Sequence, residues 1–236
     1  MFFLFLTNPI LIAAAVIPAV FLLVKVYRAD ELEKEPWPML LSLIVYGVLA
    51  TLSAMVIEKA LGSVLGLIVS KNSLIYNFIL FFIVVAFAEE GSKYFLLKKR
   101  TWSSPEFNSL FDGVVYAVFV SLGFALWENI SYVLHFGMQA ALIRAVTAVP
   151  GHACFGVFMG AWYGIAKRHE NMGNVSEAKT CRILSVLTPA LLHGCYDFCA
   201  TMNTKHSEMI FIVFVIALFA ASFIVISRIS KNDKYI

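Results

Sequence analysis

Apolar runs long enough to cross a lipid bilayer follow one another along most of this chain. A transmembrane helix needs about 20 consecutive, mostly apolar residues. The sequence supplies seven such runs, over residues 9–27, 39–57, 74–97, 113–134, 142–166, 183–202 and 209–227. Hydrophobic residues make up 61% of the chain and charged residues 14%, against about 25% charged residues in a soluble domain. We therefore predict an all-α fold, a polytopic integral membrane bundle of about seven transmembrane helices.

The length of 236 residues suits one membrane-embedded domain over residues 1–236 and leaves no room for a second, soluble domain. The short, glycine-rich stretch 58–71 lies between the second and third runs, and we expect it to be an interfacial or re-entrant piece. The net charge is only +3, so we expect no nucleic-acid partner.

The basic residues are distributed unevenly between the loops, and this bias predicts the orientation in the membrane. Cytoplasmic loops carry an excess of Lys and Arg. The first, third and fifth loops and the C-terminal tail together hold 13 of the 18 Lys and Arg residues. We therefore expect the N-terminus outside and the C-terminus in the cytoplasm.

Ionisable residues interrupt four consecutive apolar runs. A charged side chain near the bilayer centre costs about 2.5–3.5 kcal/mol on insertion scales, so such residues usually face the bundle interior and mark function. The interiors of the third to sixth runs carry seven of them, namely Glu89, Glu90, Lys93, Glu128, His152, His193 and Asp197. Seven residues confined to four adjacent helices predict a shared polar cavity.

The spacing of these residues places several of them on shared helix faces. His193 and Asp197 are four residues apart and share a face, so the aspartate can accept a hydrogen bond from one ring nitrogen and fix the histidine tautomer. Glu89 and Lys93 are also four residues apart, so the ammonium can pair with the carboxylate. Glu90 points about 100° away from Glu89, so we expect different roles for the two carboxylates.

Carboxylates, histidines and water together favour hydrolysis. A carboxylate can act as general base toward a water that attacks a peptide carbonyl, and histidines can hold the water or stabilise the developing charge. The same residue types could instead bind Zn²⁺. The sequence has neither an HExxH nor a GxSxG motif. Two other functions stay open: a proton-coupled transporter, which the lack of an inverted repeat disfavours, and a non-catalytic scaffold for a single-pass partner.

Five short stretches resemble the motifs of one known family. "EEGSK" at 89–93 matches EExxK, and "GFALWEN" at 123–129 matches GFxxxEN. "GHACFG" at 151–156 places a glycine four residues after a histidine, and "HGCYD" at 193–197 matches HxxxD. "FDGVVYA" at 111–117 resembles the entry to the family's fourth helix. In this order, the motifs resemble the PrsW family of bacterial intramembrane proteases, which is similar to the CAAX prenyl endopeptidases.

The resemblance implies a substrate and a cellular place. Members of the family cut single-pass membrane anti-sigma factors on the extracytoplasmic side, the first cut of a cascade that frees a sigma factor in a stress response. The chain would then be a multi-pass protein of the bacterial cell membrane. Its protease domain would have a motif-bearing core over about residues 74–203.

The resemblance also implies roles for individual residues, carried over by position. Glu89 and Glu90 would be the essential acidic pair. Catalysis would also need His152 and His193. The supporting residues would be Lys93, Phe124, Glu128, Asn129 and Asp197.

Metal dependence stays open at this point. The family has been grouped with metallopeptidases, whereas its CAAX-protease relatives resemble metal-independent enzymes that use a glutamate to activate water. We favour the glutamate mechanism, which requires no cofactor. If zinc is bound instead, the candidate ligands are Glu128, His152, His193 and Asp197.

Straight, upright helices would place two of the glutamates at different depths in the membrane. At about 1.5 Å rise per residue, upright helices would leave Glu89 and Glu128 about 10 Å apart along the membrane normal. A tilt, a kink or a different helix boundary would be needed to bring them into one site.

Overall fold

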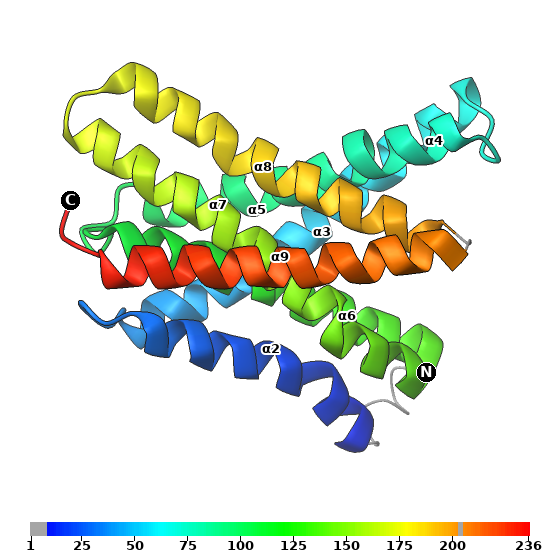
Figure 1. The fold of residues 1–236 in the computed structure, drawn as a ribbon, viewed down its shortest axis with the longest axis horizontal. Coiled ribbons are helices and arrows are strands. Elements are labelled where there is room, and N and C mark those ends of the chain that lie inside the picture. The colour runs from blue at the N-terminus through cyan, green and yellow to red at the C-terminus, as the bar shows by residue number, and fades with distance from the viewer. Residues whose placement is uncertain (1–8, 203–204) are drawn as a thin grey trace.

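The described residues, 9–202 and 205–236, are almost entirely helical in this computed structural model (Figure 1). The helices in chain order are α2 (Pro9–Ala29), α3 (Trp37–Ile68), α4 (Leu74–Ile79), η1 (Leu80–Val85), α5 (Ala86–Thr101), α6 (Leu110–Val146), α7 (Ala148–Asn171), α8 (Val175–Thr201) and α9 (Lys205–Lys231). Within this part, 6 helical stretches are long and apolar enough to cross a membrane, and one of them, Leu110–Asn171, contains both α6 and α7. The predicted all-α, multi-pass membrane fold is confirmed.

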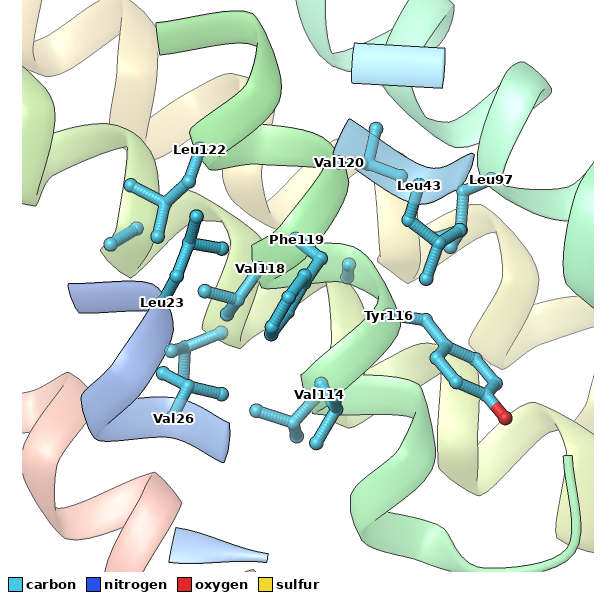
Figure 2. Close-up of a cluster of buried hydrophobic side chains, with 14 of the residues drawn as sticks. Leu23, Val26, Leu43, Leu97, Val114, Tyr116, Val118, Phe119, Val120 and Leu122 are labelled. Carbon is cyan, nitrogen blue, oxygen red and sulfur yellow. The ribbon is translucent and has the colours of Figure 1, made fainter. Parts of the chain in front are cut away.

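Helix α6 forms the centre of the bundle. Every residue from 111 to 125 is buried, and the helix packs against α2, α3 and α7. A helix that is apolar on all sides is stable either against other helices or against lipid, and this part of α6 is covered by other helices. Figure 2 shows part of the resulting core, in which Phe119 and Val118 of α6 face Leu23 and Val26 of α2.

The start of α6 explains the motif "FDGVVYA". Ser109 caps the helix, and its side chain and that of Asp112 form a capping box. The Asp112 carboxylate accepts hydrogen bonds from the backbone nitrogens of Asn108 and Ser109 at 2.9 and 2.7 Å, which satisfies donors that a helix end leaves free. Gly113 lets α7 approach, because a Cβ there would lie 2.7 Å from the Gly160 carbonyl oxygen.

The re-entrant alternative predicted for 58–71 is wrong for most of that stretch, and the interfacial alternative stays a prediction. Helix α3 continues without a break as far as Ile68 and has 32 residues. The stretch contains Gly62 and Gly66 but no proline, so no backbone donor is lost and the helix can propagate.

The predicted span at 74–97 consists of three helical pieces, α4, η1 and α5. The middle piece, η1, is a six-residue π-helix that ends just before the glutamate pair. π-helical turns are rare and occur frequently at functional sites. Here η1 packs closely on α8, because a Cβ on Gly194 would lie 2.6 Å from the Phe82 ring.

The boundary between the fourth and fifth predicted spans also differs from the expectation. Residues 142–146, expected to begin the fifth span, instead end α6. Helical geometry breaks at Gly137, whose φ of 75° and ψ of −159° are readily accessible only to glycine. The break turns the last part of α6 back toward the bundle, and α7 begins only at Ala148.

The loops expected to lie in the cytoplasm gather at one end of the bundle, together with the C-terminus (Figure 1). Hydrogen bonds join them, including Ser230 Oγ to the Ala29 oxygen at 2.7 Å, Ile236 N to the Asn108 oxygen at 2.7 Å, and Trp102 Nε1 to Glu170 Oε1 at 2.8 Å. The side of the membrane that this end faces stays a prediction, and the N-terminal residues 1–8 lie outside the described part.

Candidate active site

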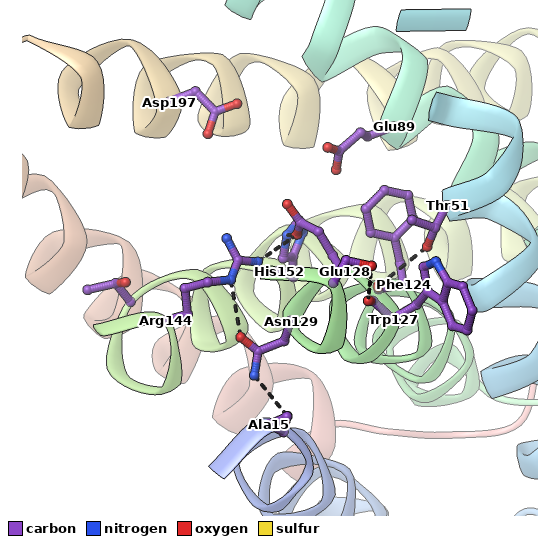
Figure 3. Close-up of polar contacts among 12 residues, drawn as sticks. Ala15, Thr51, Glu89, Phe124, Trp127, Glu128, Asn129, Arg144, His152 and Asp197 are labelled. Atoms are coloured by element: carbon purple, nitrogen blue, oxygen red, sulfur yellow. Dashed lines mark hydrogen bonds and ion pairs between the residues drawn. The ribbon is translucent and has the colours of Figure 1, made fainter. Parts of the chain in front are cut away.

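The seven ionisable residues of the predicted polar cavity come together between α5, α6, α7 and α8. A cavity of about 540 Å³ lies among these helices. Its lining includes five of the seven, namely Glu89, Glu128, His152, His193 and Asp197. Glu90 and Lys93, both 0% exposed, lie behind this lining. Figure 3 shows Glu89, Glu128 and His152 directed toward a common space.

Lys93 joins the residues behind the cavity. Its ammonium nitrogen lies 3.1 Å from Glu89 Oε2, 2.7 Å from Glu90 Oε1 and 3.2 Å from His152 Nδ1. An ammonium has three N–H donors, so these three contacts use all of them. The Phe124 ring covers the group, with its centroid 4.0 Å from Nζ. Phe124 of the "GFALWEN" motif is therefore a direct neighbour of the charged cluster.

The contacts of His152 define its tautomer. Lysine can only donate, so Nδ1 of His152 accepts a hydrogen bond from Lys93. The ring proton is then on Nε2, which donates to Glu128 Oε2 at 2.8 Å. His152 thus links Glu128 on α6 to Lys93 and, through it, to Glu89 on α5. This chain of contacts joins the two glutamates that straight helices would leave at different depths.

His193 lies between two carboxylates. Its Nδ1 is 3.0 Å from Glu90 Oε1, and its Nε2 is 3.4 Å from Asp197 Oδ2. A carboxylate beside each ring nitrogen favours the protonated imidazolium. The ring stacks on Phe155 with centroids 4.8 Å apart, which fixes its plane.

Arg144 belongs to this network although the sequence analysis did not include it among the residues of the cavity. The reversal at Gly137 brings its Nη2 to 2.8 Å from Glu128 Oε2 and its Nε to 3.1 Å from Asn129 Oδ1 (Figure 3). Asn129 in turn donates to the Ala15 oxygen of α2 at 2.8 Å. The sequence feature that could have predicted this contact is the single cation in the otherwise uncharged stretch 138–146, 16 residues after the intramembrane Glu128.

Glu58 is a second residue that the sequence analysis did not place in the site. It lies on the part of α3 that was expected to be interfacial or re-entrant, and it lines the cavity. Its half-buried side chain adds a further carboxyl group to the cavity lining.

The site also contains a group of donors suited to a metal ion. Glu89, Glu90 and His152 each offer one ligand atom, and these atoms lie within 4.8 Å of one another. Of the four ligands predicted from the sequence, only His152 belongs to this group. The Lys93 ammonium, however, contacts these same three residues. A metal ion therefore does not fit among them while the ammonium is in place.

Comparison with known proteins identifies the family. Residues 35–226 match a family model described as "PrsW family intramembrane metalloprotease". The chain is 36% identical over 188 residues to a protease PrsW of Oceanobacillus iheyensis, a match that covers 80% of this chain and 81% of that protein. It is 33% identical over 207 residues to the protease PrsW of Bacillus subtilis, covering 87% and 90% of the two chains.

A third relative, the protease PrsW of Clostridioides difficile, is 28% identical over 225 residues, covering 94% of this chain and 89% of that protein. No solved structure shows a significant match. The chain therefore belongs to the PrsW family of intramembrane proteases and is a membrane-embedded peptidase.

Proposed function

We propose that this protein is an intramembrane endopeptidase in which Glu89 is the general base that activates the attacking water. The observation that carries this assignment is the difference between the two adjacent glutamates. Glu89 lines the cavity, whereas Glu90 is fully buried and is bound to Lys93 and His193. A base must reach both water and substrate, and of the pair Glu89 lines the space they would enter.

The reaction would proceed as follows. Glu89 takes a proton from water as the water oxygen attacks the peptide carbonyl carbon. His193, held as an imidazolium by Glu90 and Asp197, donates a proton to the leaving amine nitrogen as the C–N bond breaks. The two histidines would lie beside the water, and the His193 imidazolium would stabilise the negative charge that develops on the carbonyl oxygen. Glu90, Asp197, Lys93 and Glu128 hold these groups in place.

The natural substrate that we propose is a single-pass membrane anti-sigma factor, and its cleavage would initiate release of a sigma factor in a stress response. The motif resemblance and the family membership support this proposal. The protein would act in the bacterial cell membrane, with the N-terminus outside and the C-terminus in the cytoplasm.

The test is cleavage of a co-expressed single-pass anti-sigma factor by the wild type and by Glu89→Gln, Glu90→Gln and His152→Ala, at equal membrane levels of each protein. We expect Glu89→Gln to lower cleavage by about 10²–10⁴-fold, the usual contribution of a general base. Glu90→Gln and His152→Ala should also lower it, because each change removes a partner of the catalytic groups.

His135→Ala is the matched control, because His135 is exposed and lies away from the cavity lining. It should cut like the wild type. If all variants cut equally, the polar cluster has a structural role and the assignment of the base is wrong.

A further inference from the structure

The surroundings of the Lys93 ammonium resemble the coordination shell of a metal ion. Two carboxylate oxygens and one imidazole nitrogen surround Nζ, at 3.1, 2.7 and 3.2 Å. Carboxylates and histidines are the ligands that zinc takes in catalytic sites, with distances of about 2.0–2.2 Å. The distances here are longer by about 0.5–1.2 Å and are typical of hydrogen bonds to an ammonium.

The lone pairs that a metal would need are already in use. Nδ1 of His152 has a single lone pair, and it accepts a hydrogen bond from Lys93. The other ring nitrogen is turned to Glu128 Oε2 at 2.8 Å and carries the proton. Both nitrogens of His152 are therefore unavailable to a metal ion as long as Lys93 keeps this position.

The charges of the buried carboxylates also favour an ammonium at this position. Glu90 and Lys93 are 0% exposed and Glu89 is 6% exposed, so the carboxylates of this pair have little water around them. Removing one partner from a buried ion pair is strongly destabilising, since it leaves an uncompensated charge. Lys93 donates hydrogen bonds to both carboxylates, and Phe124 covers its remaining side. The His193 ring is 3.0 Å from Glu90 Oε1 but 3.8 Å from Glu89 Oε2.

We infer that the Lys93 ammonium takes the position that a metal ion would occupy among Glu89, Glu90 and His152, so that this protein hydrolyses peptide bonds without a resident metal. The inference rests on the proposed function only for the assignment of Glu89 as the general base. It assigns Lys93 as a positioning residue that holds the base and one histidine. It also implies that removing the ammonium leaves three donors arranged to bind a metal.

The experiment measures metal binding by the purified full-length protein in detergent, with Co²⁺ as the probe. Uptake is followed by the visible absorption of protein-bound Co²⁺ and by elemental analysis after removal of free metal. The wild type should bind no Co²⁺ in a saturable way. Lys93→Ala should bind about one equivalent, because the two carboxylates and His152 Nδ1 are released.

Two controls locate the ion. The double variant Lys93→Ala with His152→Ala should lose the bound Co²⁺, since one donor of the vacated site is gone. Lys98→Ala removes an exposed lysine near the end of the same helix and should behave like the wild type.

The wild-type measurement decides the question even if Lys93→Ala does not fold. One equivalent of Co²⁺ in the wild type that disappears in His152→Ala would overturn the inference, as would a folded Lys93→Ala protein that binds none. Neither readout depends on cleavage. A protein that binds no Co²⁺ and does not cut the anti-sigma factor would support the inference while counting against the proposed substrate.

Discussion

Two cations approach intramembrane carboxylates in this protein, and their surroundings differ. Lys93 is enclosed and uses every N–H on groups of the site. Arg144 borders the cavity and holds Glu128 and Asn129, two residues of one motif, through different nitrogens of its guanidinium. A planar guanidinium presents its N–H donors in a rigid fork, whereas the donors of a lysine ammonium rotate on a flexible stem. Arg144 therefore orients Glu128, which in turn orients His152.

We expect Arg144→Ala to lower cleavage by about 10–100-fold, because a small displacement of a positioned group can cost about that much in rate. Arg144→Lys should retain more activity, since a lysine can still pair with Glu128 but not with Asn129 as well. The measurement is the rate of substrate cleavage at equal membrane levels. Arg182→Ala is the control, because it breaks a pair with Glu170 at the far end of α7. Wild-type rates for Arg144→Ala would contradict this role.

At the scale of helices, glycines set how closely α3 and α7 approach α6. Gly47 of α3 and Gly123 of α6 face each other where the helices cross, and a Cβ on Gly123 would lie 2.9 Å from Ile44 Cα. Backbone cannot move aside as the end of a flexible side chain can. Gly91 in "EEGSK" is different, because a Cβ added there would meet nothing within 4 Å.

These two glycines give a matched pair of substitutions. Gly123→Ala should destabilise the fold by about 1–3 kcal/mol, since it overpacks a helix crossing. Gly91→Ala should leave stability unchanged or raise it by up to about 1 kcal/mol, because alanine has the higher helix propensity. Thermal unfolding of the purified proteins in one detergent would measure both. An equal loss of thermal stability in the two variants would show that the helix crossing does not depend on Gly123.

At the scale of the whole molecule, a group of acidic residues lies at the end where the loops and the C-terminal tail meet. Burial, followed by the charge of Asp112, raises the pKa of Glu35 from 4.5 to about 8. The same two causes raise the pKa of Asp30 from 3.8 to about 6, with Asp233 adding to the rise and Lys34 opposing it. The folded state therefore keeps these protons at pH values where the unfolded chain has lost them.

The consequence is a stability that falls as the pH rises. The contribution of Glu35 is fully present below about pH 4.5 and is lost as the pH rises through about 8. The melting temperature of Glu35→Gln should therefore fall less than that of the wild type between about pH 5 and about pH 8.5. Glu31→Gln, in the exposed part of the same loop, should keep the wild-type dependence. Identical pH profiles for the wild type and Glu35→Gln would contradict the assignment.

The same end of the bundle should face the cytoplasm. Thirteen of the 18 basic residues lie in its loops and tail, and positive loops are retained inside. A fluorescent protein fused after Ile236 should therefore fold and emit, whereas alkaline phosphatase at the same point should stay inactive. The opposite pattern would reverse the orientation and place the basic loops outside.

Local chemistry alone determined much of this protein. Runs of apolar residues predicted a multi-pass helical bundle because backbone polar groups in lipid must be paired within helices. Charged residues inside those runs predicted a polar cavity between four helices, since no single helix can cover so many ionisable groups. The order of the motifs predicted the family before any contact between them was known.

Tertiary structure decided the contacts between residues far apart in the chain. The turn at Gly137 places Arg144 beside Glu128, although 16 residues separate them. The extension of α3 to Ile68 adds Glu58 to the cavity lining. The position of Lys93 among Glu89, Glu90 and His152 depends on how α5 packs against α7 and α8. That packing decides whether an ammonium or a metal ion lies between the three side chains. Helical periodicity specifies the face on which a side chain lies, but the partner of that face depends on the packing of the whole bundle.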